Sequence, residues 1–537
     1  MLWIALHLPR LSLESFAATL AANGDERGAE RPIALLEAHR IVSANAAAVA
    51  LGVKPGLKRA TALALAPQIV LGQADPQRDA LTLLPVAHAA LAFTPGVSLQ
   101  PALQPGAAAD TVLLEVQASL RYFGGLDRLR RAIDVALRPL GHRVHTACAT
   151  TAHGAAILSR VEPPPQCIDL AATRRALQAA PVWLLGPGRE HWEALQGMGL
   201  RTLDDLINLP RAGLARRFGE GLLVELDRAF GRRPDPREPI VLPPSFESRL
   251  ELFARADTTD QVLHGAAVLL ERLIVWLAAQ HAFVRRFRLL MHHEARWQSD
   301  RTPEASMLEI ALAEPSRDSA HLRLLLREQL ARLQLPAPTL ELRLQADDIT
   351  RRAPPNAELF ATPRSEHEGL TRLIERLQAR LGPGQVQRLV AIEDHRPERA
   401  SALCEARAIG AGSSAGGRGG EKRHRGGSPA AAVAAGPAAL RSNGRTAARP
   451  VWLQAAEPLL ERAARPLLDG RPLQLLSGPE RIEAGWWDSG LACRDYFIAA
   501  TTEGALVWIY RERLPLSRSA NEEEVGGSGW FLHGRFG

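Results

Sequence analysis

Cysteine is scarce in this chain, which has four cysteines among 537 residues. Cys148, Cys167, Cys404 and Cys493 lie far apart, with no Cys-x-x-Cys pair and no cluster of histidines beside them. This spacing excludes a zinc site built on cysteine pairs and a framework of disulfides. It predicts a reducing compartment, the cytoplasm.

Long apolar runs and a charged leader are also missing. The sequence has no uninterrupted apolar stretch of about 18 residues, the length that a membrane helix needs. No charged region precedes the apolar residues at the N-terminus. We therefore expect neither a membrane span nor a signal peptide. Aromatic residues make up only 5% of the chain.

The chain is rich in positive charge and is long. Its net charge of +7 and its pI near 9.8 favour a polyanionic partner, although many basic proteins bind no nucleic acid. A length of 537 residues is enough for roughly three to five domains. A hydrophobic fraction of 46% supports a core in most of them.

An apolar strand opens the chain, and it carries no carboxylate. Residues 1–16 read MLWIALHLPRLSLESF, which predicts a strand and then a short amphipathic helix. This layout resembles the first palm strand of the Y-family (translesion) DNA polymerases, which carries an Asp-x-Asp-x-aromatic segment for metal binding. Here Ala5, Leu6, His7 and Leu8 stand where the metal ligands should sit, and Glu14 is the only carboxylate before Asp25.

A second strand resembles the palm of the same polymerases. Residues 111–125 read TVLLEVQASLRYFGG, a buried type of strand followed by a turn and a helix. A gapless match of Leu-Glu-Val at 114–116 to the family's Leu-Asp-Val places Asp110 on the expected Asp and Thr111 on the expected Glu. The SLRYFGG end resembles the signature of the ImuB branch of the family. In this match at most one of three metal ligands survives.

The loss of these ligands bears directly on catalysis. Nucleotidyl transfer by two metal ions needs carboxylates that bridge both cations. One carboxylate cannot hold two Mg²⁺ ions, so we expect no polymerase activity, no catalytic residues, no metal and no cofactor. The alternative is an active enzyme in which Glu14, Asp110 and Glu115 regroup. It is disfavoured because Glu14 should lie beyond the strand and Glu115 should point along a buried one.

Residues 192–210, WEALQGMGLRTLDDLINLP, predict two short helices around a tight turn. The turn passes through Gly197 and Gly199, and Thr202 caps the second helix. The segment resembles the helix-hairpin-helix of the Y-family thumb, in which backbone amides approach a phosphate. Arg216 and Arg217 follow, so we expect DNA contacts here. A plain αα-hairpin with a solvated basic rim is the competing interpretation.

The next part resembles the Y-family little finger, whose sheet contacts the DNA backbone. Its expected helices and strands cover residues 259–280, 283–291, 318–333 and 339–344. Basic and apolar residues alternate in the first strand, which should place Arg286 and Arg288 opposite Phe287 and Leu289. Arg285, Arg286 and Arg288 are the candidate DNA contacts, and a solvated strand face is the alternative.

Residues 354–363, PPNAELFATP, resemble a degenerate copy of the peptide by which bacterial repair polymerases bind the sliding clamp. Leu359 and Phe360 would fill an apolar pocket of the clamp. Asn356 would take the place of the usual glutamine. A Leu-Phe pair that closes the domain against its own core is the alternative.

The C-terminal part changes composition twice. From about residue 406 to 448 it is rich in Ala, Gly, Ser and Arg, which predicts a disordered tether. Residues 451–537 predict a small β-rich module with a hairpin turn at 502–504. Five of the ten tryptophans lie in this module, which suits a compact core or an exposed protein-binding surface. The candidate partner contacts are Trp486, Trp487, Trp530 and Phe531.

The order of these parts resembles the ImuB branch, a catalytically defective group of Y-family polymerase homologues. The implied fold is multidomain, α/β and α+β. The implied domains are a palm-like domain at 1–25 and 75–165, a fingers-like region at 26–74, a thumb-like domain at 166–235, a little-finger-like domain at 236–400, a flexible linker at 401–450 and a C-terminal interaction module at 451–537.

The resemblance also implies a function, that of a non-catalytic subunit in a damage-induced (SOS) translesion synthesis complex. Such a subunit would bind damaged primer-template DNA and the sliding clamp. It would recruit a RecA-like companion, ImuA, and an error-prone C-family DNA polymerase. The alternatives are an active translesion polymerase with displaced metal ligands and a pure protein-interaction hub.

Overall fold

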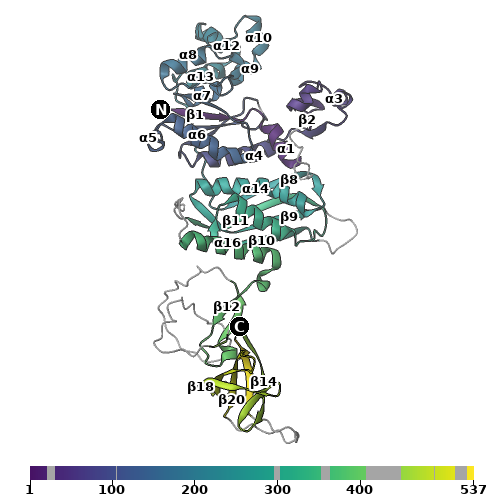
Figure 1. Ribbon diagram of the computed structural model, residues 1–537. Helices are drawn as coiled ribbons and strands as arrows, with labels where there is room; N and C mark the ends of the chain where they lie inside the picture. The colour runs from purple at the N-terminus through teal and green to yellow at the C-terminus, as the bar shows by residue number, and fades with distance from the viewer. Residues whose placement is uncertain are drawn as a thin grey trace, which may run out of the picture. The chain divides into compact units, whose positions relative to one another are not determined.

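The computed structural model of the chain describes residues 1–20, 31–104, 106–294, 303–351, 363–406, 449–450, 452–488, 490–513 and 529–536. The chain divides into two compact units, residues 1–380 and 381–537. Figure 1 labels many of their helices and strands. The first unit ends before residue 400, where the little-finger-like domain was expected to end.

The first unit begins with a four-stranded antiparallel sheet in the order β5-β6-β1-β7. Its strands are β1 (Trp3–His7), β5 (Val97–Gln100), β6 (Thr111–Glu115) and β7 (His145–Ala149). Helices α4 (Pro76–Ala90) and α6 (Leu126–Leu137) cover one face, and α7 (Ala152–Leu158) covers the other.

Side-chain alternation along β1 explains why both faces of this sheet are covered. Ile4 and Leu6 join the core formed with α4 and α6. Ala5, between them, joins the core formed with α7, because successive residues of a strand point to opposite faces. The expected apolar opening strand is therefore confirmed, with the helix α1 (Leu11–Leu20) after it.

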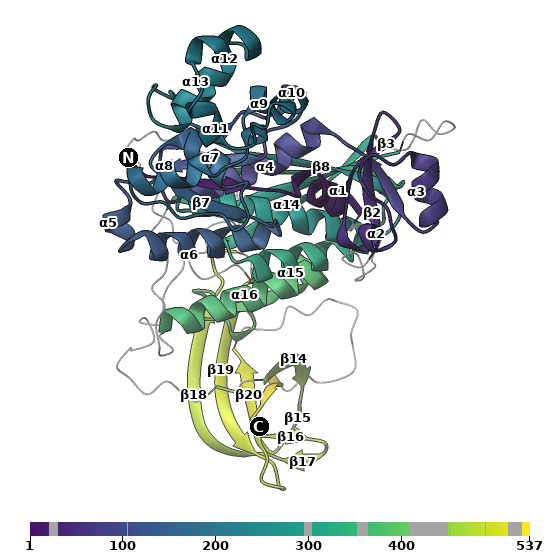
Figure 2. The ribbon, with the colours of Figure 1, turned by 90° about the horizontal axis from the view of Figure 1, so that it is seen from above.

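A smaller sheet follows, in the order β3-β2-β4, with β2 (Ile33–Glu37), β3 (Arg40–Ala44) and β4 (Val70–Gln73). Two short helices, α2 (Ala46–Ala50) and α3 (Arg59–Leu65), pack on it. The Asn45 side chain caps α2 by accepting a hydrogen bond from the Ala48 amide at 2.9 Å. Figure 2 shows this sheet and its helices beside α1.

Short helices make up the next part of the unit. They are α8 (Leu170–Gln178), α9 (Gly186–Glu190), α10 (Trp192–Gly197), α11 (Leu203–Ile207), α12 (Arg211–Phe218) and α13 (Glu220–Ala229). Their apolar side chains share one core with α7. A single turn of helix, α5 (Leu120–Phe123), precedes α6.

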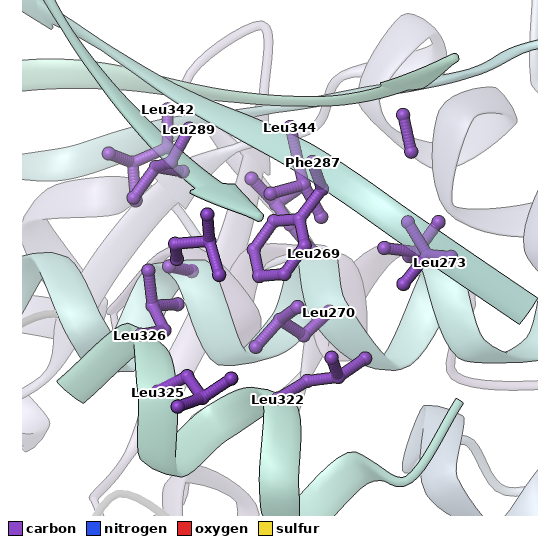
Figure 3. Close-up of a cluster of buried hydrophobic side chains, with 14 of the residues drawn as sticks. Leu269, Leu270, Leu273, Phe287, Leu289, Leu322, Leu325, Leu326, Leu342 and Leu344 are labelled. Carbon is purple, nitrogen blue, oxygen red and sulfur yellow. The ribbon is translucent and has the colours of Figure 1, made fainter. Parts of the chain in front are cut away.

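The first unit ends with a second antiparallel sheet, in the order β10-β9-β11-β8. The strands are β8 (Phe246–Ala256), β9 (Ala282–His293), β10 (Ala305–Ser316) and β11 (Thr339–Arg351). The helices α14 (Thr259–Ala279) and α15 (Ser319–Leu330) pack on one face, and leucines fill the space between them (Figure 3). Helix α16 (Pro363–Leu381) follows.

Most of the elements expected in this part are present. The helices predicted over 259–280 and 318–333 and the strands over 283–291 and 339–344 are confirmed as α14, α15, β9 and β11. Strands β8 and β10 had no counterpart among the expected elements. Of the described helices, α14 alone is long and apolar enough to cross a membrane, and 56% of its most apolar window is buried within the protein.

The second unit is rich in β-structure, as the sequence predicts. Its main sheet has the order β14-β21-β20-β19-β18, and a three-stranded sheet has the order β15-β16-β17. Their bounds are Trp452–Pro458 (β14), Leu460–Arg462 (β15), Arg465–Leu468 (β16), Arg471–Pro472 (β17), Gln474–Ala484 (β18), Ala492–Ala500 (β19), Leu506–Glu512 (β20) and Trp530–Arg535 (β21). The predicted turn at 502–504 joins β19 to β20.

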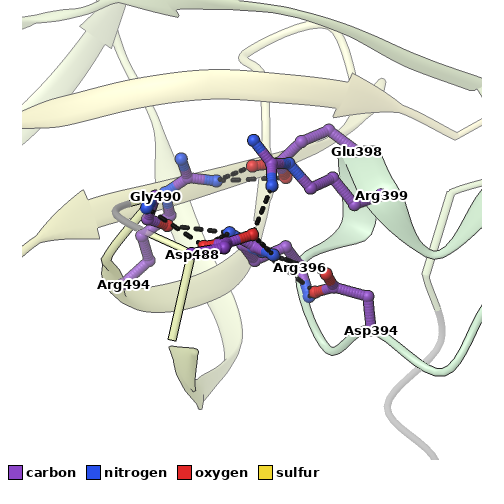
Figure 4. Close-up of polar contacts among 7 residues, drawn as sticks. All are labelled: Asp394, Arg396, Glu398, Arg399, Asp488, Gly490 and Arg494. Carbon is purple, nitrogen blue, oxygen red and sulfur yellow. Dashed lines mark hydrogen bonds and ion pairs between the residues drawn. The ribbon is translucent and has the colours of Figure 1, made fainter. Parts of the chain in front are cut away.

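A hairpin of β12 (Gln387–Ala391) and β13 (Ser401–Glu405) belongs to the same unit. Between its strands, the Arg396 guanidinium donates to the Asp488 carboxylate at 2.9 and 2.6 Å and to the Gly490 carbonyl at 2.9 Å (Figure 4). Arg494 donates in turn to Glu398 at 2.9 Å. The predicted tether lies almost wholly outside the described residues, at 407–448, and both of its flanks are in this unit.

Candidate functional site

The positions matched to metal ligands lie together where β1 ends and β6 begins. His7 pairs in register with Thr111, and Leu6 pairs with Val112. The His7 Nδ1 atom lies 3.2 Å from the Thr111 hydroxyl, which donates to the Asp110 carboxylate at 2.8 Å. Ala5 and Leu6 are fully buried in the two cores. The pairing of β1 with β6 thus brings the matched positions together, and among them Asp110 is the one carboxylate.

Arg160, which sequence analysis did not single out, is the main partner of Asp110. Its Nη2 lies 2.5 Å from the Asp110 Oδ1, and its side chain is only 8% exposed. Burial alone raises the pKa of Asp110, but the hydrogen bond with His7 and the charge of Arg160 outweigh burial and lower it to about 2. A protein cation thus holds the surviving carboxylate in its ionised form.

The carboxylates proposed to regroup are engaged elsewhere. Glu14 accepts hydrogen bonds from His142 Nδ1 at 2.9 Å and from the Arg143 amide at 3.2 Å. Glu115 lies at the far end of β6, roughly 16 Å from Asp110 at the usual rise of a strand. Within the described ranges, no group of three or more His, Cys, Asp or Glu side chains is placed to hold a metal ion.

The turn between α10 and α11 is open to solvent. Gly197 ends α10, and Gly199 has a φ of +78°, a conformation that favours glycine. A Cβ built on either glycine would meet no heavy atom within 4 Å. Thr202 caps α11 through a capping box with Asp205, which confirms the predicted cap. Residues 196–199 of this turn are exposed to solvent.

Two exposed arginines lie on α12, close in sequence to this turn. Arg216 and Arg217 form no ion pair with a carboxylate in the part of the chain that the structure describes. The Arg217 guanidinium lies 5.7 Å from the ring of Phe218, which is buried. Arg211, on the same helix, is paired with Asp227. Arg216 and Arg217 therefore keep their charge available for a polyanion.

The arginines of β9 differ in their partners. Phe287 and Leu289 are fully buried, so the predicted alternation with Arg286 and Arg288 is confirmed. Both arginines are ion-paired, through Arg288–Glu309 at 2.8 Å, Arg288–Asp347 at 3.5 Å, Arg286–Asp348 at 3.8 Å and Arg286–Glu309 at 3.9 Å. Arg285 is exposed and has no carboxylate partner among the described residues. These carboxylates reduce the attraction of the β9 face for phosphate.

The predicted partner contacts of the second unit separate into two groups. Trp486 and Trp487 are 79% and 54% exposed, and the Arg396 guanidinium lies 5.6 Å from the Trp487 ring. Trp530 is only 5% exposed and belongs to the core of the main sheet. The prediction of a surface contact for Trp530 is therefore wrong, because its position in β21 directs it inward. Phe531 is partly buried against Tyr510.

The predicted clamp contacts Asn356, Leu359 and Phe360 lie outside the described residues.

No protein-family model matches the chain. The chain is 26% identical over 501 residues to Protein ImuB of Caulobacter vibrioides, in strain NA1000 / CB15N and equally in strain ATCC 19089 / CIP 103742 / CB 15. The match covers 91% of this chain and 100% of ImuB. The chain is a homologue of ImuB. The resemblance to ImuB inferred from sequence motifs is thereby confirmed.

The similarity to ImuB reaches beyond the first unit, because 91% of the chain is more than residues 1–380 contain. Similar solved structures include DinB from Sulfolobus solfataricus and an insertion ternary complex of Dbh DNA polymerase. Each is 16% identical to the chain, and each match covers 66% of this chain and 100% of the solved one. The TM-scores are 0.35 and 0.37, respectively.

Proposed function

We propose that this ImuB homologue is a non-catalytic, polymerase-like subunit that holds DNA during damage-induced translesion synthesis. The observation that carries the proposal is the contact between Arg160 and Asp110. Two-metal nucleotidyl transfer needs several carboxylates facing the cations. Of the three matched positions only Asp110 has one, and a buried guanidinium already neutralises it.

Primer extension tests the absence of catalysis. Purified protein is incubated with a primer-template and all four nucleotides in Mg²⁺ or Mn²⁺, beside an active Y-family polymerase as the positive control. We expect no extension by the wild-type protein or by Asp110→Ala. Extension by the wild type that disappears in Asp110→Ala would establish the rival function, an active translesion polymerase.

The open turn at Gly197 and Gly199 and the unpaired Arg216 and Arg217 support DNA binding. Removing one arginine that binds a phosphate should reduce the slope of log affinity against log salt by about 1. We therefore expect a decrease of about 2 for the double variant Arg216→Ala/Arg217→Ala, since each arginine would bind one phosphate. The matched control is Arg323→Ala, because Arg323 is exposed but paired with Glu271.

The same assay separates a DNA-holding subunit from a pure protein hub. A hub would bind the primer-template with no steep dependence on salt. Within β9, loss of the unpaired Arg285 should weaken binding more than loss of Arg288, whose charge Glu309 and Asp347 already offset. An equal decrease in DNA affinity for both variants would contradict the expectation that the unpaired arginine contributes more.

The recruiting role rests on the homology with ImuB and on the exposed pair Trp486 and Trp487. The proposed partners are the sliding clamp, a RecA-like ImuA companion and an error-prone C-family polymerase, all in the cytoplasm. Replacing Leu359 and Phe360 with Ala should abolish clamp binding, and unchanged affinity would remove that claim. Trp486→Ala/Trp487→Ala should weaken capture of the companion proteins, whereas Trp452→Ala, 74% exposed, is the matched control.

A further inference from the structure

Arg272 of α14 is a buried cation without an anionic partner. The residue is only 6% exposed. Its Nη1 donates to the Ser248 hydroxyl at 3.1 Å and to the Arg249 carbonyl at 3.3 Å, both on β8. Its Nε and Nη2 have no hydrogen-bond partner, and no carboxylate pairs with it, within the ranges that the structure describes. Burial lowers the pKa of Arg272 to about 10, so the group stays charged at neutral pH.

An unpaired buried charge is costly, so a protein that keeps one usually supplies a counter-ion. Helix α4 packs against α14 and carries a buried carboxylate, Asp79, which is already used. Asp79 accepts hydrogen bonds from the hydroxyls of Ser12 and Ser15. Its ion pair is with Arg78, whose Nε lies 3.9 Å from the Asp79 Oδ1, so it does not neutralise Arg272.

Arg272 lines a pocket of about 350 Å³ formed by α1, α4, α14 and β8. Arg78 and Arg249 are the other cations of the lining, and Asp75 and Glu251 are its carboxylates. Asp75 caps α4 by accepting hydrogen bonds from two backbone amides, at 2.9 and 3.2 Å. Arg78 is paired with Asp79, whereas Arg249 and Arg272 have no carboxylate partner among the described residues.

Two aromatic rings form part of the wall. Phe16 and Phe253 lie edge to face with ring centroids 5.0 Å apart, and the Arg78 guanidinium lies 5.4 Å from the Phe16 ring. Phe16 is buried, whereas Phe253 is 51% exposed. The exposed ring of Phe253 offers a surface on which a planar group could stack.

We propose that this pocket binds a phosphate group, with Arg272 as its buried anchor. A guanidinium presents two parallel N–H groups that match two oxygens of a phosphate, and such charge-assisted hydrogen bonds are strong. A pocket of 350 Å³ accommodates a small phosphate compound. A free phosphate compound and a backbone phosphate of a nucleic acid share this chemistry. The proposal does not depend on the absence of polymerase activity.

The first experiment measures the unfolding midpoint of the full chain as inorganic phosphate replaces chloride at constant ionic strength. A ligand that binds only the folded state raises the midpoint as its concentration rises. We expect this increase in the wild type and its loss in Arg272→Met, which corresponds to a phosphate affinity weaker by about 10-fold to 100-fold. Arg323→Met, the same change outside the pocket, should keep the wild-type response.

Arg272→Lys keeps the charge but not the paired N–H groups, so its response to phosphate should fall between those of the wild type and Arg272→Met. A wild type that does not respond to phosphate would overturn the proposal. So would a folded Arg272→Met that responds fully. If Arg272→Met does not fold, the test rests on Arg272→Lys. A response of Arg272→Lys to phosphate equal to that of the wild type would then overturn the proposal.

The second experiment separates the two sources of phosphate by comparing thymidine, thymidine 5′-monophosphate and a short oligothymidylate. Tighter binding of the monophosphate than of phosphate, reduced in Phe253→Ala, identifies a mononucleotide. Preference for the oligonucleotide that disappears in Arg272→Lys identifies a backbone phosphate. Equal binding of thymidine and its monophosphate would contradict a role for phosphate.

Discussion

Replacing Arg160 tests whether a protein cation stabilises the ends of β1 and β6 around Asp110. Arg160→Met removes the guanidinium that lies 2.5 Å from Asp110 and leaves a buried apolar side chain in its place. Breaking a buried ion pair costs about 3–5 kcal/mol when the remaining charge stays buried. Asp110, however, is 36% exposed, so water and the hydroxyl of Thr111 still solvate it. We therefore expect a loss of about 2 kcal/mol for Arg160→Met.

The reverse change should cost more. Asp110→Asn leaves Arg160, which is 8% exposed, without its counter-ion, so the expected loss is about 3–5 kcal/mol. Hydrogen exchange of the backbone amides in β1 and β6 measures both losses as free energies of local opening. Arg143→Met is the matched control, since the exposed guanidinium of Arg143 forms no ion pair among the described residues and the substitution keeps the backbone amide that donates to Glu14.

Two results would refute this account of the site. One is equal and small effects of Arg160→Met and Asp110→Asn, which would mean that the ion pair contributes nothing. The other is stabilisation of the wild type by Mn²⁺ that disappears in Asp110→Asn, which would mean that a metal ion competes with Arg160 for the carboxylate.

Three further predictions concern other parts of the chain. Because the pKa of Asp110 is lowered, its contribution to stability should be complete above about pH 4 and lost as the pH falls towards 2. The free energies of unfolding of the wild type and of Asp110→Asn should therefore converge as the pH falls. A difference that stays constant with pH would contradict this. Leu269→Ala, in the core beneath the second sheet, should lower the free energy of unfolding in urea by about 2–5 kcal/mol. The exposed Leu340→Ala should lower it by less than about 1 kcal/mol. Similar losses for the two variants would argue against the packing in Figure 3. Arg396→Ala should expose the β12–β13 hairpin to limited proteolysis while β18–β21 stay protected. The control is Arg471→Ala, which removes an arginine that donates to Glu503 instead. An unchanged digest of Arg396→Ala would show that its polar contacts do not hold the hairpin.

Strong periodicity made much of the fold predictable. Helix α14 has apolar residues at helical spacing over its whole length, and β9 alternates basic and apolar residues, so both were found. Strand β10 also alternates, with Ile310 and Leu312 inward and Glu309 outward. Its signal was present in the sequence but weaker, because alanines take several of its positions. A half-exposed edge strand of this kind is recognised with confidence only beside its partner.

Sequence matching singled out Asp110 and Thr111 but not the partner of Asp110. Asp110 and Thr111 were found by matching a strand, which is a local property. Arg160 is fifty positions along the chain, and nothing in its neighbourhood distinguishes it from the other arginines; only the packing of α7 against β6 brings it to Asp110. Arg272 escaped notice for the same reason. Partners of this kind depend on tertiary contacts that local patterns do not encode.

Burial of aromatic residues was also beyond the reach of the sequence. Trp486, Trp487 and Trp530 lie in similar surroundings along the chain. Trp530 points from β21 into the core of the main sheet, whereas Trp486 and Trp487 occupy the connection between β18 and β19. Composition identified the module, and the order of its strands decided which tryptophans face solvent.

The contacts of Arg396 with Asp488 and Gly490 join parts of the second unit that lie on either side of residues 407–448 in the sequence. Strands β13 and β14, on either side of that segment, both belong to the second unit, and the chain leaves the first unit near residue 381. The length of the segment therefore does not set the separation of the units. A protease cut within 407–448 should give two fragments that migrate together on a native gel and separate under denaturing conditions.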